Sequence, residues 1–173
     1  MRALILAGAV ADRRVIRSCG GSVQLFERFR RHRGLLAAFM PRLVRQARHH
    51  GLDARFVRLV LRQEVSRLTA DVDAPGLARR LLGSLREGLR PGLDGPLTDI
   101  DLLTRDWGVS PAGLRVPTLI LHGDADQVVP PAHGRWYAQM IPGAELEIAP
   151  AHGHISLVVN KARRIFAAVD AAA

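Results

Sequence analysis

The sequence is poor in cysteine, lysine and aromatic residues. Cys19 is the single cysteine in 173 residues, so the chain cannot form an internal disulfide, which fits a reducing cytoplasm. Lys161 is the single lysine, and aromatic residues make up 5% of the chain. The formal charge of +9 is therefore carried by arginines, without the aromatic residues that stack on bases. We expect no nucleic-acid partner.

Long apolar runs are also missing. No stretch approaches the roughly 20 apolar residues of a membrane-spanning helix. The apolar stretch 3–10 is too short for a signal peptide, and charged residues 12–14 follow it at once. With 48% apolar residues, the chain is long enough for one globular core and too short for two ordinary domains. We therefore expect a soluble, cytoplasmic protein without a membrane partner.

The most informative stretch is 116–130, which reads VPTLILHGDADQVVP. The apolar run 118–121 predicts a strand buried on both faces, as in a parallel sheet. Two carboxylates, Asp124 and Asp126, follow at the carboxyl end of this strand, where ligands collect in α/β sheets. Pro130 and the proline after it then predict the start of a helix.

A second strand is predicted over 144–149, where residues alternate in polarity, and the loop after it contains Gly153 and His154. This stretch combines an acid at the end of a strand, a helical spacer and a Gly-His pair. Together they resemble the region of the last two strands of the α/β-hydrolases. The resemblance implies that Asp126 is the acid and His154 the histidine of a catalytic triad. A histidine that moves protons needs a buried carboxylate to fix its tautomer, so we expect these two side chains to meet. Asp124 is the weaker alternative for the acid. Either carboxylate could instead serve only as a turn or helix-capping residue.

The chain opens with a third apolar stretch, 2–9, which predicts another buried strand. In the hydrolase pattern such a strand follows the nucleophile and leads into a helical cap. The resemblance implies a partial α/β-hydrolase fold, with about three parallel strands, flanking helices and a helical cap insertion. We assign the core to 1–19 and 108–173 and the cap to 20–107, with the nucleophile-bearing part absent.

Helical periodicity marks the cap and the C-terminus. Amphipathic segments are predicted at 35–49, 54–68 and 75–89, with a shorter helix at 97–103. A last helix is predicted over 156–169, capped by Ser156. Its sheet-facing residues are predicted to be Leu157, Val158, Ile165, Phe166 and Val169.

The sequence contains no Gly-x-Ser-x-Gly, the strained turn that presents a nucleophilic serine. Cys19 and Ser22 are the nearest substitutes, but they lie well past the first strand, and we interpret 18–22 as a loop entering the cap. We therefore expect the chain to supply Asp126 and His154 to a nucleophile located elsewhere, and to be inactive alone. The family reaction cleaves an ester, amide, epoxide or similar bond in a small molecule, and no cofactor is expected.

Two other functions remain open from the residues. The edge of the strand at 2–9 is hydrophobic and has no preceding partner, which favours a non-catalytic module that pairs with an N-terminal partner chain or a second copy. Asp124, Asp126, His152 and His154 carry side chains that bind zinc or manganese. The pairs Asp-x-Asp and His-x-His are common by chance, so we assign no metal. We interpret His152 as a surface histidine.

Overall fold

The computed structural model describes residues 3–30 and 64–171, together with 32, 34, 38, 41 and 42. Among these residues, three parallel strands form a sheet in the order β1-β2-β3. The strands are β1 (Leu4–Ala7), β2 (Thr118–Gly123) and β3 (Glu145–Ala149). Leu4 lies opposite Thr118, and Leu119 lies opposite Glu145. The predicted three-stranded parallel sheet is confirmed.

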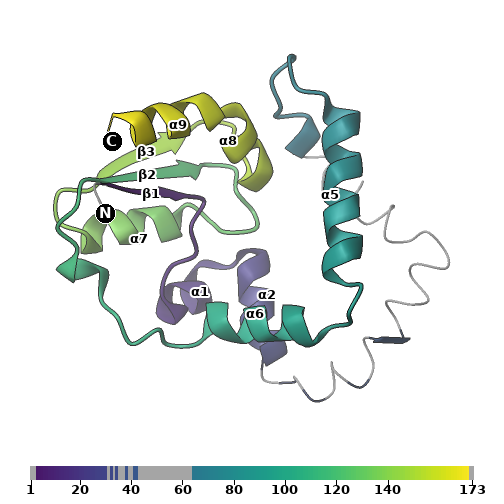
Figure 1. The fold of residues 1–173 in the computed structure, drawn as a ribbon. Helices are drawn as coiled ribbons and strands as arrows, with labels where there is room; N and C mark the ends of the chain where they lie inside the picture. The colour runs from purple at the N-terminus through teal and green to yellow at the C-terminus, as the bar shows by residue number, and fades with distance from the viewer. Residues whose placement is uncertain are drawn as a thin grey trace.

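Helices cover both faces of this sheet (Figure 1). One face packs on α7 (Ala132–Met140). Tyr137 of this helix and Ile141, which follows it, join Ile120 of β2 in the buried core. The other face packs on α8 (His154–Asn160) and α9 (Ala162–Asp170). A 3₁₀ turn, Pro111–Gly113, precedes β2. Among the described helices, none has the length and apolar content that crossing a membrane requires.

The chain leaves β1 through two short helices, α1 (Arg13–Cys19) and α2 (Gly21–Arg30). Asp12 caps α1 by accepting from the Arg14 N–H at 2.8 Å. Gly20, with φ of 75°, separates the two helices because it adopts a conformation that other residues resist. The predicted loop at 18–22 is therefore wrong, since its first two residues end α1 and its last two begin α2.

Two predicted cap helices are confirmed as α5 (Ala74–Gly88) and α6 (Asp94–Thr104). Asp73 caps α5 through the Gly76 N–H, and α6 packs on α2. The predicted helix at 35–49 lies outside the described residues except for 38, 41 and 42, and 54–68 is described from 64 onward. The division into core and cap stays a prediction.

The C-terminal helix differs from its prediction. It breaks at Lys161, which separates α8 from α9. Of the five predicted sheet-facing side chains, Leu157 is fully buried and Ile165 is partly buried. Val158, Phe166 and Val169 are 47%, 67% and 50% exposed, so their assignment to the sheet is wrong. Ser156 lies inside α8, where its Oγ accepts from the Gly153 N–H at 2.8 Å. The prediction that Ser156 is the N-cap residue of this helix is therefore wrong, since Gly153 holds that position.

Candidate active site

Asp126 lies in the loop after β2, and its side chain is buried. Its Oδ1 accepts from the N–H groups of Val128 and Val129, at 2.9 and 2.8 Å. These two bonds hold the carboxylate rigidly in a turn of the kind that aspartate favours. The other oxygen, Oδ2, is left to contact histidine.

His154 is the first residue of α8, and its Nδ1 lies 2.8 Å from Asp126 Oδ2. The structure thus brings together the two residues that the sequence analysis singled out. The hydrogen bond to Asp126 raises the pKa of His154, against the opposing effect of burial. Because Nδ1–H donates to the carboxylate, Nε2 carries the lone pair in the neutral ring. That tautomer suits a general base, and the catalytic role of the pair stays a prediction.

The two other candidate residues, Asp124 and His152, do not take part in this contact. Asp124 is exposed, whereas Asp126 is 3% exposed. His152 Nδ1 lies 2.7 Å from the Pro150 carbonyl oxygen. Across the described part of the chain, no three His, Cys, Asp or Glu side chains are grouped as metal ligands. The geometry therefore gives the metal-site alternative no support.

Gly8 is a site residue that the sequence analysis missed. It follows β1 with φ of 58°, and a Cβ placed there would lie 3.4 Å from His154 Nδ1 and 3.8 Å from Asp126 Oδ2. The backbone at the end of β1 therefore packs against the Asp126–His154 pair. The positive φ and the close packing both favour glycine here.

Two buried histidines behind Asp126 were also missed. His122 Nε2 donates to the Val129 carbonyl oxygen at 2.8 Å and lies 3.7 Å from Asp126 Oδ2. His133 Nδ1 accepts from the Ala11 N–H at 2.9 Å. Both rings are fully buried, and burial lowers the pKa of His122 and lowers that of His133 to about 4. His122 is a neutral support of the loop that carries the acid, and His133 is a neutral support of the backbone after β1.

The two substitute nucleophiles do not complete a triad. Cys19 ends α1 with its Sγ 3.5 Å from Ser18 Oγ. Ser22 lies in α2, and its N–H donates to the Gln127 carbonyl oxygen. Within the described residues, neither side chain hydrogen-bonds to His154.

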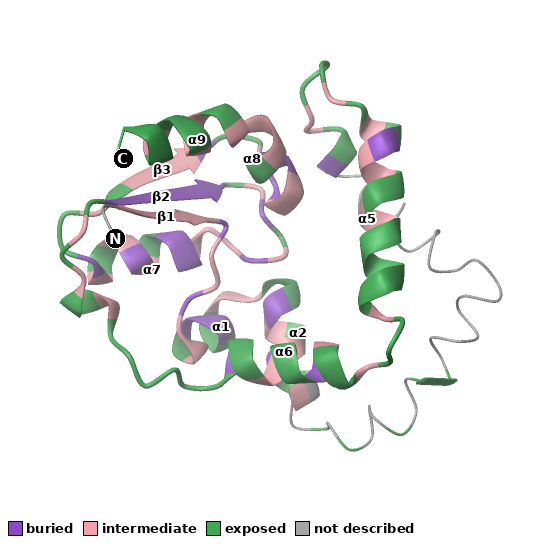
Figure 2. Cartoon of the chain, in the orientation of Figure 1, coloured by how far each residue is buried: buried purple, intermediate pink, exposed green. Residues whose placement is uncertain are grey.

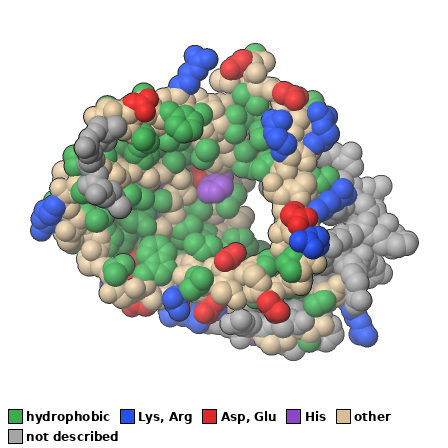
Figure 3. Space-filling view, in the orientation of Figure 1, with side chains coloured by type: hydrophobic (Ala, Val, Ile, Leu, Met, Phe, Trp, Pro, Cys, Tyr) green, Lys and Arg blue, Asp and Glu red, His purple; other side chains and the backbone are tan. Residues whose placement is uncertain are grey.

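One face of the molecule is largely apolar. Figure 3 shows a histidine side chain in a hollow at the centre of this face, surrounded by hydrophobic groups. The His154 side chain is 35% exposed, whereas Asp126 beneath it is inaccessible. A reactant can therefore reach the ring of His154 but not the carboxylate.

Comparisons with known proteins agree with this arrangement. An esterase, RhEst1, from Rhodococcus sp. ECU1013 has a TM-score of 0.54 and 20% identity, covering 98% of this chain and 55% of its own. A hydrolase from Pseudomonas aeruginosa has a TM-score of 0.57 and 22% identity, covering 98% of this chain and 54% of its own. An alpha/beta hydrolase fold protein from Nakamurella multipartita has a TM-score of 0.55 and 24% identity, covering 96% and 60%.

Similarity in sequence is confined to a short stretch. A non-heme chloroperoxidase from Kitasatospora aureofaciens is 55% identical over 40 residues, which are 22% of this chain and 14% of that protein. No family model matches the sequence. The chain spans 54–60% of the length of the three solved structures. Its sheet order, its helices and these neighbours together show that it has part of the α/β-hydrolase fold.

Proposed function

We propose that this chain provides the acid and the base of an α/β-hydrolase that cleaves an ester, amide, epoxide or similar bond in a small molecule. The observation that carries the proposal is the 2.8 Å contact between His154 Nδ1 and Asp126 Oδ2, at the carboxyl end of a parallel sheet. The fold neighbours that include esterases support hydrolysis as the reaction class.

The geometry suits a two-step ester hydrolysis. His154 Nε2 takes the proton of a nucleophilic hydroxyl as that oxygen attacks the substrate carbonyl carbon, and returns it to the departing alcohol. Water then gives a proton to the same nitrogen as its oxygen attacks the acyl carbon. Nε2 passes that proton to the nucleophile's oxygen as the bond to the acyl group breaks, which releases the acid and restores both groups. Asp126 stays ionised throughout and stabilises the imidazolium.

The edge of β1 that faces away from β2 is the proposed docking position of the segment that carries the nucleophile. Within the described residues β1 pairs with β2 alone, and its Leu4 and Gly8 N–H groups donate toward that strand. Backbone groups alternate in direction along a strand, so those of Ile5 and Ala7 face outward. We propose that a further strand pairs there, from the same polypeptide or a partner chain.

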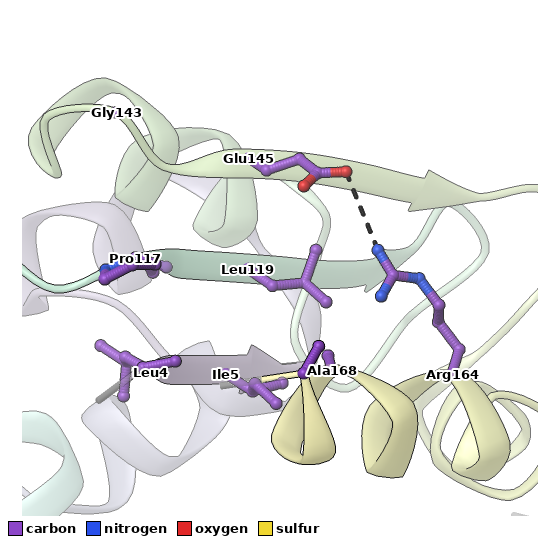
Figure 4. Close-up of a pocket in the computed structure, with 11 residues that line it drawn as sticks. Leu4, Ile5, Pro117, Leu119, Gly143, Glu145, Arg164 and Ala168 are labelled. Atoms are coloured by element: carbon purple, nitrogen blue, oxygen red, sulfur yellow. Dashed lines mark ion pairs between the residues drawn. The ribbon is translucent and has the colours of Figure 1, made fainter. Parts of the chain in front are cut away.

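Hollows on both faces of β1 support this proposal. One of about 350 Å³ lies between the strand starts and α9, lined by Leu4, Ile5, Leu119 and Ala168 (Figure 4). Another, of about 240 Å³ and mostly apolar, is lined on the opposite side by Leu4, Leu6 and Trp136 among others. Both hollows leave side chains of β1 accessible, as expected for a strand that a further segment would cover.

The first prediction concerns the isolated chain. We expect no turnover of p-nitrophenyl acetate above that of a chain with His152→Ala or His154→Ala, because the proton acceptor has no nucleophile to activate. The matched His152 variant accounts for ester cleavage by surface imidazole. Turnover that disappears in the His154 variant alone would contradict the proposal that the chain is inactive by itself.

The second test supplies a nucleophile. The genomic DNA upstream of this reading frame is expected to encode a Gly-x-Ser-x-Gly segment. Expressed with that segment, the protein should hydrolyse short-chain esters, and His154→Ala should lower the rate by about 10²–10⁴-fold. His152→Ala is the control and should retain it. A rate indifferent to His154 would overturn the proposed function. An upstream region without a nucleophile would exclude the same polypeptide as its source and leave only a partner chain.

The free edge of β1 also favours a second function, self-association without catalysis. Unpaired strand edges with apolar surroundings pair readily with another copy. Sedimentation velocity across a hundredfold concentration range would detect it, with Ile5→Lys as an edge-disrupting control. A wild-type chain that stays monomeric at every concentration would exclude this alternative.

A further inference from the structure

Glu64, in the predicted cap, reaches across 90 residues of sequence to the start of α8. Its Oε1 accepts from the His154 N–H at 3.0 Å. Its Oε2 accepts from the N–H groups of Ile155 and Ser156, at 3.2 and 2.9 Å, and from Ser156 Oγ at 2.8 Å. Four donors from three successive residues therefore converge on one carboxylate.

This carboxylate is buried, since Glu64 is 8% exposed. Burying a carboxylate costs several kcal/mol unless hydrogen bonds replace its water. Here, among the described residues, the replacement comes from N–H and O–H donors of α8. A glutamate that merely decorated the cap surface would remain in water, so its position reflects a specific contact.

The contact is made at His154 itself. The backbone N–H of His154 is bound by Glu64, while its ring is bound by Asp126. A side chain at position 153 would overlap the Glu64 carboxylate, which explains the glycine of the Gly-His pair. His154 is thus held from two sides, by the core through its ring and by the cap through its backbone.

A second contact joins the same cap segment to the far end of α8. Asn160 donates through Nδ2 to the Arg67 carbonyl oxygen at 2.7 Å, and its Oδ1 accepts from the Thr69 N–H at 3.2 Å. Figure 1 shows the start of the described cap segment beside α8. Asn160 attaches the cap without touching the start of the helix, so it provides an internal control for Glu64.

We propose that Glu64 is a positioning residue: it couples the placement of the cap to the placement of the His154 ring against Asp126. When the cap segment 64–69 lies on α8, residues 154–156 are fixed and the ring is aligned. When the segment moves away, the first turn of α8 loses three backbone contacts and the alignment relaxes. The proposal rests on the proposed function for its catalytic meaning, but its test needs no nucleophile.

Charge gives a readout that attachment alone would not change. Within the described ranges, the charged or titratable groups that act on the His154 ring are Asp126 after β2, His122 on β2 and Glu64 from the predicted cap. The negative charge of Glu64 helps to raise the pKa of His154, behind the larger effect of Asp126. Removing that charge should lower the pKa of His154.

The experiment compares the full chain with Glu64→Gln and Asn160→Ala by NMR. The His154 ring is assigned from the signal that His154→Ala removes, and its pKa and tautomer are followed by titration. We expect Glu64→Gln to lower the pKa of His154 and to speed amide exchange at 154–156 by roughly tenfold or more. Asn160→Ala should leave the pKa of His154 unchanged while speeding exchange at Thr69.

Each other outcome overturns the proposal. If Glu64→Gln leaves the pKa of His154 and the exchange of 154–156 at wild-type values, Glu64 does not position the ring. If Asn160→Ala lowers that pKa equally, the contact serves cap attachment only. Should Glu64→Gln fail to fold, Glu64→Asp keeps the charge with a shorter reach. Faster exchange at 154–156 in that variant is then the expected result, and unchanged exchange overturns the proposal.

Discussion

β1 and β2 have similar apolar sequences but different surroundings. β2 is buried at each of its residues, whereas each residue of β1 is only partly buried, as Figure 2 shows along the sheet. An apolar run indicates that a strand is suited to a neighbouring strand on each side. Among the described residues β2 has both neighbours and β1 has one. The following predictions test that difference.

The largest effect is expected from matched truncations in the two strands. Ile120→Ala in β2 removes a side chain that is 1% exposed and should lower the free energy of unfolding by about 2–5 kcal/mol. Ile5→Ala in β1 should cost about 1 kcal/mol, because that side chain lines an open hollow. Urea denaturation measures both. Equal losses would show that β1 is as well packed as β2.

An effect of about 3 kcal/mol is expected from His133, which supports the backbone after β1. Its pKa is lowered to about 4, so the stability that its neutral form contributes is present above pH 6.5 and is lost as the pH falls toward 4. Unfolding free energies of His133→Gln should fall less over this range, the remaining slope coming partly from His122 of β2. His152→Gln is the control, and an unchanged slope in the His133 variant would refute the assignment.

A smaller effect is expected from the glycines that follow or end the two strands. Gly123→Ala at β2 places a Cβ against the backbone carbonyl of His152 and should cost about 1–3 kcal/mol. Gly8→Ala should cost about 1 kcal/mol, because its neighbours can give way but its φ is positive. The Gly8 variant should shift the ring signals of His154 in NMR spectra. If it does not, the end of β1 does not support the site.

Much of the core could be predicted because its signals are local. The strand from Thr118, the helix after Pro131 and the loop before His154 each follow from periodicity and from glycine or proline within a few residues. The choice of Asp126 over Asp124 needed the hydrolase resemblance, since both carboxylates follow the same strand. In the structure Asp126 is the one that contacts His154.

What the sequence concealed depends on contacts between distant segments. Glu64 has an ordinary place in an amphipathic pattern, and its partners lie 90 residues away. His122 resembled a strand-end residue, and nothing in the pattern indicated that it and His133 would be buried near one acid. The helix break at Lys161 was missed because no glycine or proline marks it, and Val158, Phe166 and Val169 were assigned to the sheet because they are apolar.

The fastening of segment 64–69 onto α8 has a consequence for protein engineering. Exchanging the predicted cap for another is one way to seek a new specificity. Under the predicted division, a transplanted cap would lack the Glu64 carboxylate that accepts hydrogen bonds from residues 154–156, and Asn160 would face foreign backbone. A successful chimera should therefore retain Glu64 and its following turn with the recipient scaffold, and place its junctions beyond Thr69.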